Sequence, residues 1–198
     1  IRLLNDQQKL DLHNAKLQDN LLDFLLQRQR WFLQERGIRY DLIEAVLQNH
    51  ITKKQPQESR GSRALPAEQL HFAEFLGQHL DSDIFKRSVE AIVRAENISK
   101  KYSNMIVEKI DESALKHAKE KKFFAALQPI LNSDPNTRWT PEKFMKQLHS
   151  IEPVVTGFFE DVMVMDDDPV KSGNRLWLCM QLAKWSGRHL DLQAIVFA

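Results

Sequence analysis

The sequence has little of what small folds use for cross-links and for phosphate binding. Its 198 residues include one cysteine and six glycines. The single thiol, Cys179, cannot form a disulfide within the chain, and its apolar neighbours predict a small buried side chain in a reducing compartment. There is no glycine-rich phosphate loop and no GxSxG or comparable nucleophile motif. We therefore expect no catalytic constellation and no cofactor site within these residues.

Long apolar runs and an excess of one charge are also missing. No stretch approaches the roughly 20 consecutive apolar residues that a membrane span needs, which predicts a soluble chain without a membrane partner. The first residue is Ile1, and no secretion or transit signal follows it, so we expect a piece of a larger polypeptide. Lys and Arg total 28 against 27 Asp and Glu, a net charge of +1. A claim of nucleic-acid binding therefore has to rest on local basic clusters.

Apolar residues recur every three or four positions, which predicts an all-α fold, a helical bundle. Residues 1–19 are expected to be a connector from a preceding domain. Residues 20–198 are expected to form the helical domain, with a mobile loop at about 49–66. Within it we expect helices over 19–37, 41–47, from Pro66, 85–98, 112–131 and from Pro141, another start after Pro153, and a last helix around 176–185. A short strand is possible only at 162–165.

Two side-chain groups could carry chemistry, and each has a simpler interpretation. The acidic run 166–168 could bind magnesium, but acids ahead of a proline and a helix more often cap and solvate a turn. The seven histidines are scattered, so zinc has little support and no metal is predicted. Trp31, Phe32, Phe158 and Phe159 could stack on unpaired bases, although aromatic residues at helical spacing usually belong to the core.

Basic residues that share a helical turn are the better candidates for RNA contact. Arg28 and Arg30 are close on one helix, and the segment RAENISKK, residues 94–101, combines Arg94 and Lys101 with Asn97. Arginine suits phosphates and base edges, and asparagine can pair with base edges. The lysine-rich segment 116–122 is interpreted instead as a solvated helix face.

Several segments together resemble one family. Phe24–Leu47, FLLQRQRWFLQERGIRYDLIEAVL, is similar to the opening of the C-terminal domain of the bacterial-type glycyl-tRNA synthetase beta subunit. Arg94, Asn97 and Ile98 match the R-x-x-N-I helix of that family. The closing segments PV, FFE, VMVM and NRL, between residues 153 and 176, match its ending in order and spacing.

The resemblance implies an all-helical anticodon-binding domain related to that of arginyl-tRNA synthetase. The parent enzyme would join glycine to its tRNA with ATP and magnesium, and that chemistry would belong to the alpha subunit or to the alpha portion of a fused chain. This fragment would bind glycine tRNA rather than catalyse, in the cytoplasm or in a plastid or other organelle. The basic clusters and the matched motifs give these candidate tRNA-binding residues: Arg28, Arg30, Arg94, Asn97, Lys101, Asn174 and Arg175.

Two alternatives stay open on the sequence. Arg28 and Arg175 could bridge helices and Asn97 could cross-link the bundle, in which case the domain would be a helical protein-interaction or subunit-scaffolding module. The chain also departs from the family at 169–172, where Pro-Val-Lys-Ser replaces acid-Ala-Leu-Arg. Either Lys171 supplies the missing positive charge there or the contact is lost. Val93 likewise stands where the family often has lysine.

Overall fold

The computed structural model describes residues 15–47, 66–134, 137 and 139–197, with side chains from residue 20 onward. These residues form helices and turns and contain no strand, which confirms the all-α prediction. The α-helices are α1 (Ala15–Glu35), α2 (Tyr40–Leu47), α3 (Pro66–Gly77), α4 (Asp83–Lys101), α5 (Ala118–Leu131), α6 (Pro141–Asp161) and α7 (Pro169–Gly187). Single 3₁₀ turns are η3 (Ser103–Met105), η4 (Glu112–Ala114) and η5 (Leu192–Ala194).

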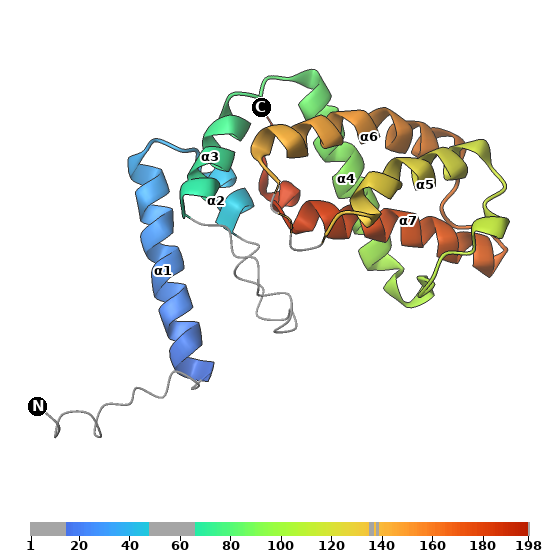
Figure 1. Cartoon of the computed structure of the whole chain (residues 1–198), viewed down its shortest axis with the longest axis horizontal. Coiled ribbons are helices and arrows are strands. Elements are labelled where there is room, and N and C mark those ends of the chain that lie inside the picture. The colour runs from blue at the N-terminus through green and yellow to red at the C-terminus, as the bar shows by residue number, and fades with distance from the viewer. Residues whose placement is uncertain (1–14, 48–65, 135–136, 138, 198) are drawn as a thin grey trace, which may run out of the picture.

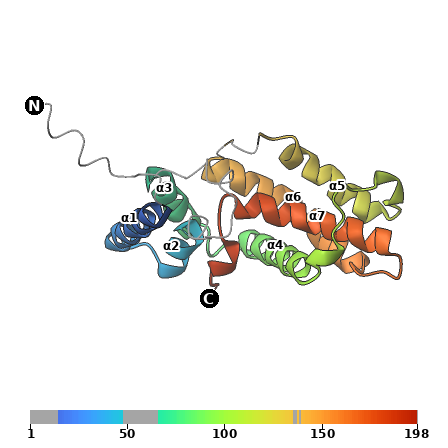
Figure 2. The ribbon, with the colours of Figure 1, turned by 90° about the horizontal axis from the view of Figure 1, so that it is seen from below.

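Four of the helices form a bundle in which α6 and α7 are the shared middle. Helix α4 packs on α6 and α7, and α5 packs on the same two helices (Figure 1). Figure 2 shows α4 and α5 on opposite sides of that middle layer. Helices α2 and α3 pack together at one end, and α1 packs on α2 and extends away from the bundle. The bundle therefore has two separate outer faces, one on α4 and one on α5.

Local sequence chemistry explains where several helices begin. Thr140 caps α6, because its hydroxyl accepts a hydrogen bond from the Lys143 N–H at 3.3 Å, and Pro141 occupies the first helical position as predicted. The Ser82 hydroxyl caps α4 in the same way, accepting from the Phe85 N–H at 3.4 Å. These caps satisfy backbone donors that have no partner inside the helix.

The start of α5 differs from the prediction. The helix begins at Ala118, and the expected start at Glu112 is a separate 3₁₀ turn. The His117 ring nitrogen accepts from the Lys119 N–H at 3.3 Å, and the Glu120 carboxylate accepts from the His117 N–H at 2.9 Å. This reciprocal capping box starts the helix six residues later than apolar spacing indicated.

Pro153 does not start a new helix, and that prediction was wrong. Helix α6 continues through it from Pro141 to Asp161. The proline is exposed, whereas Ile151 and Val155 on either side of it are buried. Burial of one continuous apolar stripe therefore outweighs the missing backbone donor of the proline.

The possible strand at 162–165 is also absent. Its alternation is real, because Val162 and Val164 are buried while Met163 is 81% exposed. No neighbouring strand pairs with it among the residues that the structure describes. The segment is part of the extended link between α6 and α7, residues 162–168.

The predicted connector and loop are only partly covered. Helix α1 begins at Ala15, so the helix crosses the expected boundary between 1–19 and 20–198, and that division stays a prediction. Residues 1–14 and the loop at about 49–66, up to residue 65, lie outside the described residues.

One end of the core is an aromatic cluster that encloses a histidine. The Phe144 and Trp185 rings stack with centroids 5.0 Å apart, and the His189 ring lies 5.3 Å from Phe144 and 5.8 Å from Trp139. Burial disfavours the imidazolium and lowers the pKa of His189 to about 4.

This burial predicts acid sensitivity in a defined pH window. The pKa of His189 is about 4 in the folded chain and 6.5 in the unfolded chain, so the unfolded state binds the extra proton between those values. We expect the free energy of unfolding to fall as pH drops through that window, by up to about 3 kcal/mol from this group. His189→Phe keeps an aromatic ring and should flatten the profile in urea titrations. An unchanged profile in that variant would contradict the assignment.

Candidate functional site

The outward face of α4 carries a row of basic and amide side chains. Residues seven apart lie on the same side of an α-helix, which places Arg87, Arg94 and Lys101 in line, with Asn97 beside them. All are exposed. We call Arg87, Arg94, Asn97 and Lys101 the α4 row. The sequence predictions included every member except Arg87, and the seven-residue spacing was the signal that could have found it.

Two side chains of α6 contact the arginines of the α4 row. The Arg94 guanidinium carbon lies 4.4 Å from the centroid of the Phe159 ring, and Arg87 Nε lies 3.7 Å from Glu152 Oε1. Phe159 and Glu152 are also seven residues apart, so the two helices repeat the same contact position. The charged ends of both arginines are therefore held in place while they remain accessible.

Charge on the row is only partly compensated. Within the described residues, neither Arg94 nor Lys101 forms an ion pair, and the Lys101 Nζ lies 5.2 Å from the Tyr102 ring centroid. The Asn97 side-chain oxygen accepts from Gln193 Nε2 at 3.2 Å, which leaves the amide nitrogen as a donor. The row can thus offer cations and an amide donor to an anionic ligand.

The predicted residues Arg28 and Arg30 lie elsewhere, on α1. Arg28 is exposed and lies 5.7 Å from the centroid of the Phe24 ring. Arg30 forms two hydrogen bonds to Glu44 of α2, Nε to Oε1 at 2.8 Å and Nη2 to Oε2 at 3.1 Å. In Figures 1 and 2, α1 lies beyond α2 and α3 from the bundle. The structure does not bring these two arginines to the α4 row.

Arg175 is buried in the bundle. Its Nε donates to Glu120 Oε1 at 2.6 Å, and its Nη1 donates to the Met163 carbonyl at 2.9 Å and to Asp166 Oδ2 at 3.0 Å. These partners belong to α5 and to the extended link that precedes α7. The geometry favours the helix-bridging alternative for this residue, and an RNA contact by Arg175 stays an untested prediction.

Asn174 is buried beside it and holds a loop. Its Oδ1 accepts from the Asp111 N–H at 3.0 Å, and its Nδ2 donates to the Asp111 carbonyl at 2.8 Å. Both polar atoms of the amide are therefore used to fix the segment ahead of η4. The next residue back, Gly173, approaches that loop so closely that a Cβ there would lie 2.6 Å from Val107 Cγ1.

The acidic run 166–168 caps α7, which confirms the simpler of the two interpretations. Asp168 Oδ1 accepts from the Val170 N–H at 2.9 Å, and Asp166 Oδ1 accepts from the Asp168 N–H at 3.0 Å. The latter bond and the Arg175 contact lower the pKa of Asp166. No group of His, Cys, Asp and Glu in the described part of the chain is placed to hold a metal ion.

At the departure from the family pattern, Lys171 turns toward the acids. Its Nζ lies 3.6 Å from Asp166 Oδ1 and 4.0 Å from Asp168 Oδ2. Ser172, at the position of the usual arginine, is fully buried, and its hydroxyl bonds to the N–H and the carbonyl of Asp166 at 2.8 and 2.9 Å. The Lys171 charge is thus shared with neighbouring carboxylates.

The structure supports some of the remaining sequence interpretations and not others. Phe158 and Phe159 are core residues, whereas Trp31 and Phe32 are exposed. The segment 116–122 is not wholly solvated, because Glu120 is buried against Arg175. Cys179 is buried as predicted, and burial raises the pKa of its thiol to about 12.

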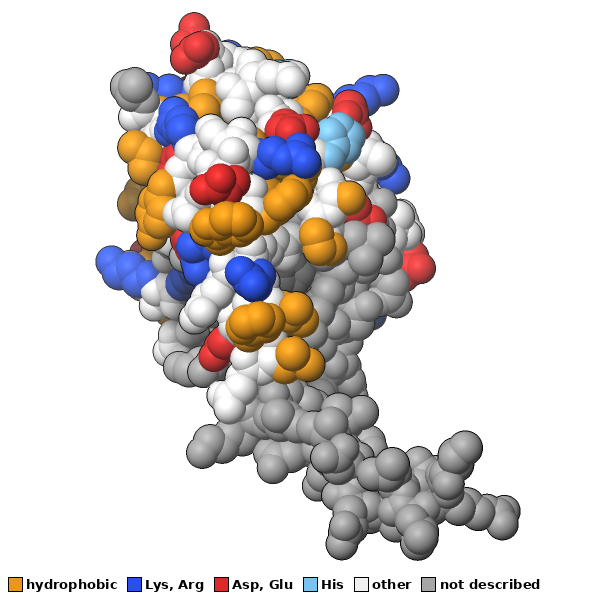
Figure 3. All heavy atoms as spheres, turned by 90° about the vertical axis from the view of Figure 1, so that its left-hand side faces the viewer, with side chains coloured by type: hydrophobic (Ala, Val, Ile, Leu, Met, Phe, Trp, Pro, Cys, Tyr) orange, Lys and Arg blue, Asp and Glu red, His pale blue; other side chains and the backbone are white. Residues whose placement is uncertain are grey.

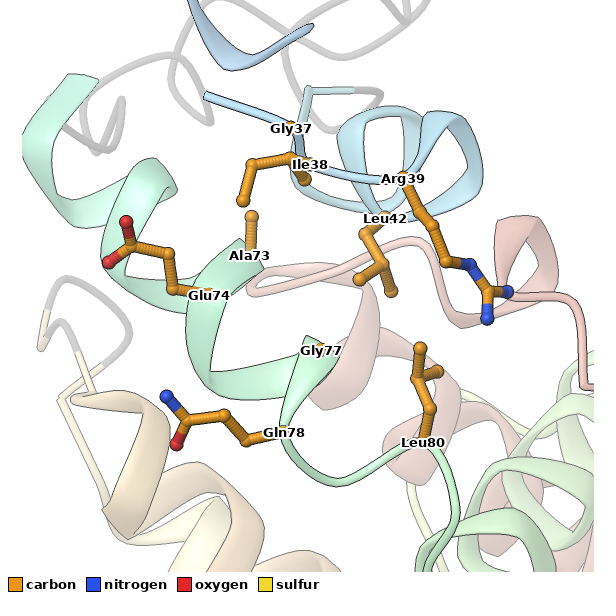
Figure 4. Close-up of a pocket in the computed structure, with 9 residues that line it drawn as sticks. All are labelled: Gly37, Ile38, Arg39, Leu42, Ala73, Glu74, Gly77, Gln78 and Leu80. Atoms are coloured by element: carbon orange, nitrogen blue, oxygen red, sulfur yellow. The ribbon is translucent and has the colours of Figure 1, made fainter. Parts of the chain in front are cut away.

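A hollow of about 400 Å³ lies between the turn joining α1 to α2 and the end of α3 (Figure 4). Ile38, Leu42 and Leu80 give it an apolar lining, and its one cation, Arg39, is bound to Asp41 with Nε to Oδ1 at 3.0 Å. The nine lining residues include no histidine, cysteine or serine, so the hollow lacks a nucleophilic side chain next to a general base. Among the described helices, none has the length and apolar character to cross a membrane.

Comparisons with known proteins point to one family. The family model described as DALR anticodon binding domain matches residues 89–192. The glycine–tRNA ligase beta subunit of Lactobacillus gasseri is 28% identical over 183 residues, 92% of this chain and 24% of the relative. The same-named subunits of Clostridioides difficile and Photorhabdus laumondii are 26% and 32% identical over 98% of this chain and 26% of each relative. The chain spans about a quarter of the length of these curated relatives.

The burial of Arg175 predicts a stability role that can be separated from binding. Arg175→Met leaves the Glu120 carboxylate buried without its cation, and we expect the free energy of unfolding to fall by about 3–5 kcal/mol in urea titrations. Arg28→Ala, which removes an exposed cation, is the matched control and should change it by less than about 1 kcal/mol. A stable Arg175→Met chain with weakened tRNA binding would instead favour direct RNA contact.

Proposed function

Because the chain belongs to the family of DALR anticodon binding domains, we propose that it binds the anticodon region of glycine tRNA in support of aminoacylation. The glycine–tRNA ligase beta subunits that match nearly the whole chain support the choice of tRNA. The domain acts by binding, and the synthetase to which it belongs performs the ligation.

The α4 row is the observation that carries this proposal. Arg94, Asn97 and Lys101 lie inside the matched region 89–192, and Arg87 lies just ahead of it. Anticodon bases are unpaired and can be reached at their edges, and the adjoining phosphates need cations. The Arg94 guanidinium, which forms no ion pair with the residues that the structure describes, suits a base edge or a phosphate. Lys101 suits a phosphate, and the Asn97 amide suits a base edge.

The support beneath the row favours recognition over loose electrostatic attraction. An arginine stacked on Phe159 and backed by α6 loses less conformational freedom on binding than a free side chain would. Glu90, exposed one turn before Arg94, keeps the surface from being uniformly basic. The net charge of +1 also makes non-specific attraction weak.

The proposal extends to the parent enzyme, and the names of the relatives support its beta-subunit part. The parent would be a glycine–tRNA ligase beta subunit or the beta portion of a fused chain, working with an alpha subunit or alpha portion. ATP and magnesium would be used in that catalytic portion. We place the enzyme in the cytoplasm, as for a bacterial synthetase, with a plastid or other organelle as the alternative.

Substitution in the row should weaken binding to glycine tRNA. Arg94→Ala should cost about 1–3 kcal/mol if the guanidinium contacts a base. Lys101→Ala should weaken the binding of all tRNAs alike. It should also reduce the slope of log affinity against log salt concentration by about one unit, as expected for one lost phosphate contact. Lys121→Ala, an exposed cation on α5 at the opposite side of the bundle, is the control. Unchanged affinity in a folded Arg94→Ala chain would remove Arg94 from the site.

Anticodon reading itself requires a comparison of two RNAs. We expect glycine tRNA to bind more tightly than the same tRNA with an exchanged anticodon across a salt series, with both affinities falling as salt rises. Equal affinity at every salt concentration would contradict anticodon recognition and favour the scaffolding alternative.

A further inference from the structure

Helix α1 carries an exposed apolar surface that the proposed function does not use. Five large apolar side chains on it are between 37% and 56% exposed, and we call them the α1 patch: Leu21, Phe24, Leu25, Trp31 and Phe32. Figure 3 looks onto this side of the molecule and shows apolar side chains gathered in groups with basic side chains among them.

The patch is the second apolar face of the same helix. Leu26 and Leu33 on the other side of α1 are buried in the core. A helix that is apolar on both sides is normally enclosed on both sides. Here α2 is the main helix that packs on α1. One apolar face of α1 is thus buried against the described residues, and the patch is exposed to solvent.

Two arginines give the patch the chemistry of a protein interface. Arg28 lies over the Phe24 ring at 5.7 Å, and Arg36 lies over the Phe32 ring at 4.9 Å. Neither forms an ion pair within the described part of the chain. Tryptophan and arginine are enriched where protein interfaces bury most binding energy. The expected partner surface is apolar with acidic groups at its edge.

The composition argues against RNA and against a second copy. Leucine side chains such as Leu21 and Leu25 have no ring on which a base could stack. Contact with hydrated phosphates would not remove their apolar surface from water. Arg28 lies near the middle of the patch, so a two-fold axis through it would bring two like charges together. Neither objection applies to a different protein surface.

We propose that the α1 patch docks against another domain of the same synthetase polypeptide. The matched relatives carry about three quarters of their length outside the region aligned with this chain. A domain joined in one polypeptide has an effective concentration of about 1 mM at the patch, so even a weak apolar contact forms. Docking there would fix the α4 row relative to the rest of the enzyme. The proposal does not depend on RNA binding.

Cysteine labelling at two positions of α1 tests it. Leu25→Cys places a thiol in the patch. Gln34→Cys, nine residues later at about 100° per residue, places one at an exposed position outside the patch, half a turn around the helix from Leu25. Cys179 is buried and does not interfere. Alkylation is followed by mass spectrometry of the α1 peptide in this 198-residue chain and in the full-length polypeptide. A contact with a dissociation constant of about 0.1 mM should slow Leu25→Cys labelling about tenfold in the full-length polypeptide only.

Several outcomes would overturn the proposal. Equal rates at Leu25→Cys in both chains would show that nothing docks there, and equal slowing at Gln34→Cys would show a contact that is not specific to the patch. Slowing in the 198-residue chain that grows with its concentration would identify a second copy. Slowing that appears only on addition of glycine tRNA would identify RNA. Loss of tRNA binding in α4-row variants would leave the labelling rates measured without RNA unchanged, so the two proposals fail independently.

Discussion

The buried guanidinium of Arg175 joins α7 to α5 through Glu120 and to the extended link through Asp166 and the Met163 carbonyl. A charge taken out of water is tolerated only when its partners are in place, so this contact restricts how these elements can pack. Glu120 also closes the capping box that starts α5. Helix α6 packs on both α5 and α4. The arrangement that presents the outer face of α4 is therefore connected, through α5 and α6, to a charge that is largely buried.

That connection explains how a chain with few chemical groups can still present a recognition surface. Phe159 is part of the core, yet its ring packs against the exposed Arg94 guanidinium. Positioning comes from the bundle, and the chemistry offered to a ligand comes from the ends of the side chains. The α1 patch lies on a helix that packs mainly on α2, outside that bundle. The molecule thus separates a surface suited to RNA from one suited to protein.

The predictions of the fold succeeded where the determining contacts are local. The helix start at Thr140 and Pro141 depends on a side chain and a backbone donor three residues apart, which a sequence shows directly. The predictions failed where a competing local signal had to be weighed against burial. Pro153 should end a helix by its own chemistry, but the buried stripe around it keeps α6 intact. The His117 and Glu120 capping box is visible in the sequence, but apolar spacing alone predicts a start at Glu112.

The sequence by itself determined the helical periodicity, the buried thiol, the cap at the acidic run and the resemblance to an anticodon-binding domain, because these reside in residue type and short spacing. Only the tertiary structure decided which charges face solvent. Arg94 and Arg175 are the same residue type on helices of the same bundle. Arg94 is exposed over the Phe159 ring, whereas Arg175 is hydrogen-bonded to Glu120, 55 residues away in the chain. Spacing along the chain assigns a side chain to a face of its helix. What packs against that face is set by the whole bundle, since burial of the shared core fixes the neighbours together.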